Sequence, residues 1–218
     1  MSRFITVKGV GKYSSKPDVI ILTLSLTAQK MKYEDSMGLA QTQITQLREA
    51  FLPLGFEKED LKTANFSVNT CYESYRDKND NYCKRFTGYS VSHSLKLEFA
   101  LDSKLLAKVL GAVADSMSKP EIRIKFAIKD RDAVCAALLE DAAKNAREKA
   151  EILTRASGVK LGKLASIDYN WGEISLLSRT EYELPNRCME CSSDAGIDIE
   201  PDDVDVRDTV TLVWEIED

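Results

Sequence analysis

Apolar and polar side chains alternate from Tyr89 onward in residues 86–99, FTGYSVSHSLKLEF. One side of an extended chain would carry the apolar residues and the only histidine, namely Tyr89, Val91, His93, Leu95, Leu97 and Phe99. The other side would carry Ser90, Ser92, Ser94, Lys96 and Glu98. Because successive side chains in a strand point to opposite faces, the stretch predicts a strand with one buried face and one face in water.

The segments on either side predict further strands and three helices. Residues 66–72 are also strand-like, and the polar stretch 73–81 predicts a hairpin tip between them and 86–99. Apolar stripes at steps of three and four predict helices at 35–52, at 102–115 after a capping Asp102, and from Asp130 to a left-handed cap at Gly158. Further strands are expected at 4–10, 19–26, 120–129, 163–171 and 206–216. We expect 4–10 to pair with 19–26 through the turn at 11–18.

The order of these elements indicates the fold class. Strand, helix and hairpin follow one another twice, in halves of roughly 1–100 and 119–218 joined by the helix at 102–115. We therefore predict a single domain over 1–218, of α+β class, with mostly antiparallel sheets and helices packed on one face.

Composition limits the classes of function. The 218 residues are 44% hydrophobic and 30% charged, which is typical of a globular protein. The formal net charge of -5 argues against nucleic acid as a partner. No apolar run is long enough to span a bilayer, and the first residues run into a strand pattern without the features of a secretory signal. These observations favour a cytoplasmic location, where the five cysteines would be reduced.

Two further features of the sequence resemble parts of binding or catalytic sites. Gly9-Val10-Gly11 is not followed by a helix that could supply amides to a phosphate, so a turn is favoured. His93 would have to be the base for any serine or cysteine nucleophile, yet its place in the apolar phase of a strand favours a structural role. A metal site with several histidines is excluded. We expect neither a catalytic site nor a cofactor, and no enzyme activity.

Cys188-Met189-Glu190-Cys191 has the spacing of a redox pair or half a zinc site. A thioredoxin-like pair begins a helix after a strand, and this one lies in a polar segment. A zinc site would need two more ligands, for which Cys71 and Cys83 are the candidates, since they flank the hairpin tip. Loop thiols without a special role are favoured over both alternatives, and no bound metal is expected.

The long connection from 169 to 206 is unusually apolar for a loop. Its apolar residues are Tyr169, Trp171, Ile174, Leu176, Leu177 and Tyr182. Exposed apolar groups in such numbers usually mark a contact, and the acidic residues around them argue against an independent core. The segment therefore predicts a contact between copies of the chain, or with another protein.

Several short motifs, taken in order, resemble the SIMPL-domain family. They are ITVKGVG at 5–11, KPD at 16–18, GF at 55–56, DLKT at 60–63, FTGY at 86–89, the alanine-rich helix around Ala143 to Leu153, GVKLG at 158–162 and VTLV at 210–213. The resemblance implies an α+β fold and ring-like or channel-like homo-oligomers. It also implies a role in bacterial envelope or oxidative-stress physiology, and partner binding, because a mammalian member binds a Pelle-like kinase. It implies no enzyme activity.

Taken together, the residues and the resemblance predict a non-enzymatic, self-assembling binding or scaffold protein. The alternative is a thiol-based redox or zinc protein that uses Cys188 and Cys191.

Overall fold

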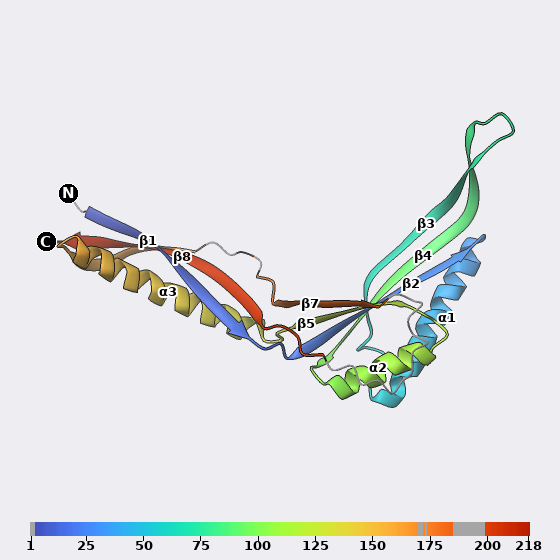
Figure 1. The fold of residues 1–218 in the computed structure, drawn as a ribbon, viewed down its shortest axis with the longest axis horizontal. Helices are drawn as coiled ribbons and strands as arrows, with labels where there is room; N and C mark the ends of the chain where they lie inside the picture. The colour runs from blue at the N-terminus through green and yellow to red at the C-terminus, as the bar shows by residue number, and fades with distance from the viewer. Residues whose placement is uncertain (1–2, 170–171, 173, 185–198) are drawn as a thin grey trace. The chain divides into compact units, whose positions relative to one another are not determined.

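The computed structural model describes residues 3–169, 172, 174–184 and 199–218, and it confirms the α+β class (Figure 1). The elements in chain order are β1 (Arg3–Ser15), β2 (Val19–Lys30), α1 (Tyr33–Phe51), a short 3-10 helix (Leu52–Leu54), β3 (Lys62–Arg76), β4 (Tyr82–Ala100), α2 (Ser103–Asp115), β5 (Glu121–Ala127), α3 (Arg131–Ala156), β6 (Lys160–Asp168), β7 (Leu177–Leu184) and β8 (Val204–Glu217).

Contacts divide the chain into two compact units. Unit 1 comprises Met1–Asp18, Ala127–Arg179 and Pro201–Asp218, and unit 2 comprises Val19–Phe126 and Thr180–Glu200. Among the described residues, one sheet has the strand order β1-β8-β6 and the other has the order β3-β4-β2-β5-β7. These units are divided differently from the two halves expected from the order of elements, and the single-domain organisation stays a prediction.

The expected pairing of the first two strands is wrong. β1 pairs antiparallel with β8 along its whole length, from Arg3 opposite Ile216 to Ser15 opposite Val204. β2 pairs instead with β4, from Val19 opposite Ala100 to Lys30 opposite Tyr89. The residues between β1 and β2 therefore link two sheets, and they do not form the turn of a hairpin.

The two glycines predicted to form a turn, Gly9 and Gly11, instead lie within β1 where α3 crosses it. A Cβ atom on Gly9 would be 2.0 Å from the carbonyl oxygen of Ala142, and one on Gly11 would be 2.1 Å from that of Leu138. Ala142 and Ala146 are fully buried in this contact. Glycine is therefore needed here because the helix backbone lies directly on the strand, and not because the chain turns.

The outer edge of β1 is covered by side chains from one row of α3. The Oδ2 atom of Asp141 accepts a hydrogen bond from the Lys12 N–H at 2.9 Å, and the Oδ1 atom of Asn145 accepts one from the Val10 N–H at 3.0 Å. One helical turn further, the Nζ of Lys149 donates to the carbonyl oxygen of Lys8 at 3.2 Å. These bonds satisfy backbone groups that would otherwise be open to another strand.

In unit 2, α1 and α2 pack on one face of the five-stranded sheet (Figure 1). The buried face of β4 includes Leu95 and Leu97, as the alternating sequence predicts. The predicted cap of α2 is confirmed, because the Asp102 carboxylate accepts hydrogen bonds from the N–H groups of Lys104 and Leu105. Among the described residues, no helix has both the length and the apolar character to cross a bilayer.

The helix caps of unit 1 also agree with the sequence. The Asp130 carboxylate accepts a hydrogen bond from the Ala133 N–H at the start of α3. Gly158 has a φ of 74°, the left-handed conformation expected after the end of that helix.

Candidate functional site

A two-stranded arm extends from the five-stranded sheet. It comprises residues 71–76 of β3 and 82–88 of β4, and Figure 1 shows this hairpin continuing beyond the end of β2. The last β2 residue, Lys30, lies opposite Tyr89, so within the described residues the arm has no third strand. Gly88 sits at the base with a φ of 125°, and a Cβ there would be 2.2 Å from the Lys30 carbonyl oxygen. A two-stranded ribbon is only marginally stable by itself in water.

A row of aromatic rings runs from α1 onto the arm. It consists of Tyr33, Tyr89, Phe86 and Tyr72, and we call these four residues the aromatic row. Successive ring centroids are 5.8, 5.3 and 5.7 Å apart, and each pair meets edge to face. Such contacts order the rings against one another while leaving part of each ring in water.

The arm exposes much aromatic surface. Tyr72, Tyr75 and Tyr82 have exposed fractions of 57%, 46% and 77%. Near the tip, the Arg76 guanidinium lies 4.6 Å from the centre of the Tyr82 ring. Tyrosine and arginine are the residue types that most often anchor protein interfaces. The arm therefore has the composition and exposure of a contact surface.

This surface is not predicted by the sequence pattern, because residues 73–81 have the composition of a polar hairpin tip. The available signal was the density of rings on both sides of that tip, with Tyr72, Tyr75, Tyr82 and Phe86 within fifteen positions.

The cysteines of the arm are too far apart to share a metal ion. Cys71 lies opposite Gly88 and Cys83 lies opposite Tyr75, four residues further along β3. At about 3.3 Å per residue, this places them about 13 Å apart along the strand. Two thiolates on one zinc ion lie at most about 5 Å apart, since each Zn–S bond is about 2.3 Å. Cys188 and Cys191 lie outside the described residues, within which no group of three or more His, Cys, Asp or Glu side chains could hold a metal ion.

His93 is half-buried on β4, opposite Leu26 of β2 and Phe66 of β3. Its Nε2 atom is 2.8 Å from the Thr63 hydroxyl, and its ring meets Phe66 edge to face at 5.2 Å. Its Nδ1 atom is buried without a hydrogen-bond partner among the described residues. Burial, and to a smaller extent the charge of Arg48, lower the pKa of His93 from 6.5. A hydroxyl and an imidazole are thus paired, but no described carboxylate orients the ring as a catalytic triad requires.

The lowered pKa of His93 predicts a pH dependence of stability. The unfolded chain binds a proton near pH 6.5 and the folded chain binds it only at lower pH, so folding loses free energy as the pH falls below about 6.5. Above that pH the contribution is fully present. We expect His93→Gln to reduce the slope of unfolding free energy against pH between about pH 7 and pH 5, measured by urea unfolding. Equal slopes in parent and variant would contradict this assignment.

The connection from 169 to 206, predicted as a contact surface, has several of its apolar residues in internal contacts of unit 1. The Tyr169 hydroxyl donates to Asp208 Oδ2 at 2.7 Å, and this bond raises the pKa of Tyr169 to about 12. Leu176 is buried and Ile174 packs against the same core.

Two other residues of the segment are partly exposed. Leu177 and Tyr182 are each 39% exposed, and Tyr182 meets Phe126 edge to face. Trp171 lies outside the described residues. Of the predicted contact residues, Leu177 and Tyr182 are therefore still accessible to a partner. The role of this segment in assembly stays a prediction.

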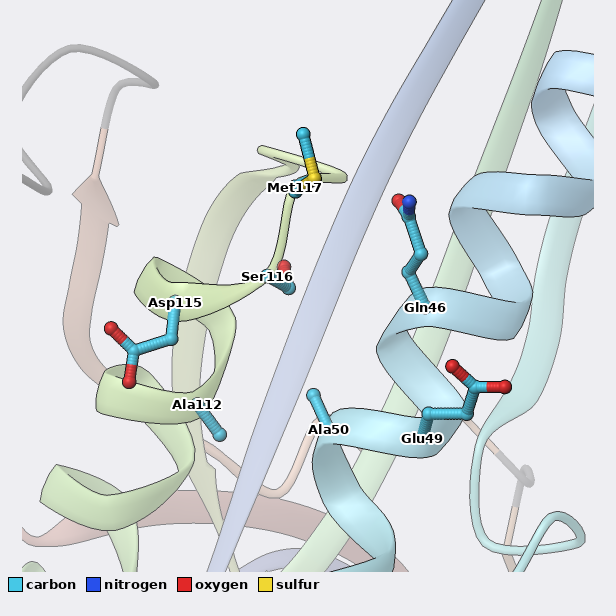
Figure 2. A pocket seen from close by; sticks show the side chains of 7 residues that line it. All are labelled: Gln46, Glu49, Ala50, Ala112, Asp115, Ser116 and Met117. Carbon is cyan, nitrogen blue, oxygen red and sulfur yellow. The ribbon is translucent and has the colours of Figure 1, made fainter.

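A shallow pocket of about 420 Å³ lies between α1 and α2. Figure 2 shows that the carboxylates of Glu49 and Asp115 point away from each other, while Ala50 and Ala112 face each other across the gap. The Ser116 hydroxyl already donates to the carbonyl oxygen of Val113 at 2.7 Å. No polar groups converge in this pocket, so it is a weak candidate for a binding or catalytic site.

Two curated proteins are similar to this chain over almost its full length. They are the 26 kDa periplasmic immunogenic proteins of Brucella melitensis biotype 1 and of Brucella abortus strain S19. Each is 28% identical over 222 residues, covering 97% of this chain and 84% of the relative.

These relatives contradict the cytoplasmic location that was expected from the sequence. Both are named as periplasmic proteins. That expectation rested on the pattern of the first residues, and the names of two relatives that match 97% of the chain overturn it.

The family that the ordered motifs suggested is also found by direct comparison. A family model described as "SIMPL: Protein of unknown function (DUF541)" matches residues 5–214. This match includes both units and the arm. The chain belongs to the SIMPL family.

Proposed function

We propose that this protein is a non-enzymatic binding protein that assembles with copies of itself, and that the arm is the main contact. The observation that carries this proposal is the exposed aromatic surface on an unsupported two-stranded ribbon. Monomeric proteins rarely leave large apolar patches in water, and a ribbon of this kind gains stability when a partner covers it.

Several other features fit this proposal. In unit 1, α3 closes the β1 edge through Asp141, Asn145 and Lys149, which limits uncontrolled pairing of strands there. The partly exposed Tyr182 of unit 2 would be a further contact. We place the protein in the periplasm, because both Brucella relatives are named for that compartment.

Multi-angle light scattering on the intact protein tests self-assembly. We expect a molar mass that is a multiple of 24.4 kDa and that falls toward this value on dilution. A mass of one chain at every concentration, up to several hundred micromolar, would contradict the proposal.

A further inference from the structure

The face of the five-stranded sheet opposite α1 and α2 carries a regular grid of uncharged polar side chains. In an antiparallel pair, residues directly opposite each other lie on the same face of the sheet. The register of β3, β4 and β2 places three such rungs side by side, which we call the polar grid: Asn65–Ser94–Ser25, Ser67–Ser92–Thr27 and Asn69–Ser90–Gln29. None of these nine side chains is charged, in a chain where 30% of residues are.

A cavity of about 510 Å³ adjoins this grid on the same sheet. It is lined by Thr23, Ser25, Ser94, Glu121, Ile122, Arg123 and Glu183. Its size falls within the range of small-molecule sites, about 300–1,000 Å³.

An ion-pair network holds the charged side of the cavity in place. The Arg123 guanidinium donates to Glu183 at 2.6 Å and lies 3.1 Å from Glu181. Lys125 follows Arg123 on the same face of β5. It lies 3.4 Å from Glu181 and so belongs to the same network. The guanidinium therefore lies between two carboxylates of β7, and its charge is largely compensated within the unit.

The side chains around the cavity favour one class of ligand. The lining residues present no large apolar side chain to an apolar ligand, because the Ile122 side chain is buried in the core beneath the sheet. An anion is disfavoured by Glu121 and Glu183. Glu181 and Glu183 already have Arg123 as their ion-pair partner, so they offer a cation little uncompensated charge. Hydroxyls and amides both donate and accept hydrogen bonds, which matches a ligand that carries many hydroxyl groups of its own.

We propose that this face binds a neutral saccharide, with one residue of the sugar chain in the cavity and the next along the polar grid. The Ser25 and Ser94 hydroxyls belong to both the cavity and the grid, so they lie at the centre of the site. A second copy of the chain fits this face less well, because the grid offers no aromatic or arginine anchor. The inference does not depend on self-assembly through the arm.

An array of immobilised glycans tests the inference on the intact protein. It would carry neutral hexose and N-acetylhexosamine oligosaccharides beside sialylated ones, and the best neutral ligand would then be titrated by calorimetry. We expect the protein to bind to immobilised neutral glycans and not to sialylated ones. Removing both central hydroxyls with Ser25→Ala and Ser94→Ala should weaken binding about tenfold or more, because the modest contributions of the lost hydrogen bonds add together.

The matched control removes two hydroxyls from the outer surface of α1, with Thr42→Ala and Thr45→Ala, and should leave the affinity unchanged. Retention of no neutral glycan, or of sialylated glycans alone, overturns the proposal. Equal affinity in the Ser25/Ser94 variant and the parent overturns it as well. A change in molar mass of that variant without a change in glycan affinity would make this face a contact between copies instead.

Discussion

Replacing Gly9 by alanine is expected to lower the free energy of unfolding of unit 1 by about 3 kcal/mol or more. The new Cβ atom would lie 2.0 Å from the carbonyl oxygen of Ala142 and 2.7 Å from the Cβ of Ala146. Neither atom belongs to the far end of a flexible side chain, so α3 must move away from β1. That movement also lengthens the hydrogen bond between the Val10 N–H and Asn145.

A second glycine provides the matched control. Gly111 lies within α2, and apart from the backbone of its own helix no atom is within 4 Å of the place where its Cβ would be. Gly111→Ala should therefore stabilise the protein by up to about 1 kcal/mol through helix propensity alone. Urea unfolding followed by circular dichroism measures both changes. A loss below about 1 kcal/mol for Gly9→Ala would contradict the close contact of α3 with β1.

Replacing Tyr72 and Phe86 together by serine is expected to weaken self-association about a hundredfold. The two rings are neighbours across the arm, with centroids 5.7 Å apart, and both keep part of their surface in water. Covering the exposed part of two rings contributes about 2–3 kcal/mol, and 1.4 kcal/mol corresponds to a factor of ten in affinity. Light scattering over a dilution series measures the shift.

Ile152→Ser serves as the control for this variant. It removes a similarly exposed apolar side chain from α3 in unit 1, far along the sequence from the arm. The control should keep the association of the parent. Equal weakening by both variants would indicate that assembly depends on general surface hydrophobicity, and an unchanged mass in the Tyr72/Phe86 variant would remove the arm from the contact.

Local patterns in the sequence predicted most of the elements. The alternation at 86–99 and the apolar stripe of α1 depend on neighbours within a few residues, so they can be recognised without knowledge of the partner strands. The caps at Asp102, Asp130 and Gly158 are local for the same reason.

Features that depend on distant segments were not predictable in this way. The partner of β1 is β8, about 200 residues away, and no local pattern selects it over β2. Gly9 and Gly11 predict a turn from the sequence alone, because the closeness of α3 is not visible there. Leu176 was expected at a contact surface, but it fills a gap beside Val134 and Leu138 in the core of unit 1.

The candidate site was predicted less well than the fold. Self-assembly was expected from the segment around Tyr169 and Leu176, whereas the most exposed aromatic surface lies on the arm. Exposure depends on where β2 ends relative to β3 and β4, and this was not visible in the sequence. The sequence showed the rings at Tyr72 and Tyr82 but not that they remain exposed beyond the end of β2.

Amide hydrogen exchange in the arm tests the central claim most directly. It would be followed by mass spectrometry in peptides covering 71–76 and 82–88, on intact protein at an assembled and at a strongly diluted concentration. We expect these amides to exchange at least about tenfold more slowly in the assembled protein, because a partner would stabilise a ribbon that is otherwise marginal. If the arm exchanges equally fast at both concentrations while the molar mass changes, copies of this protein meet through a different surface.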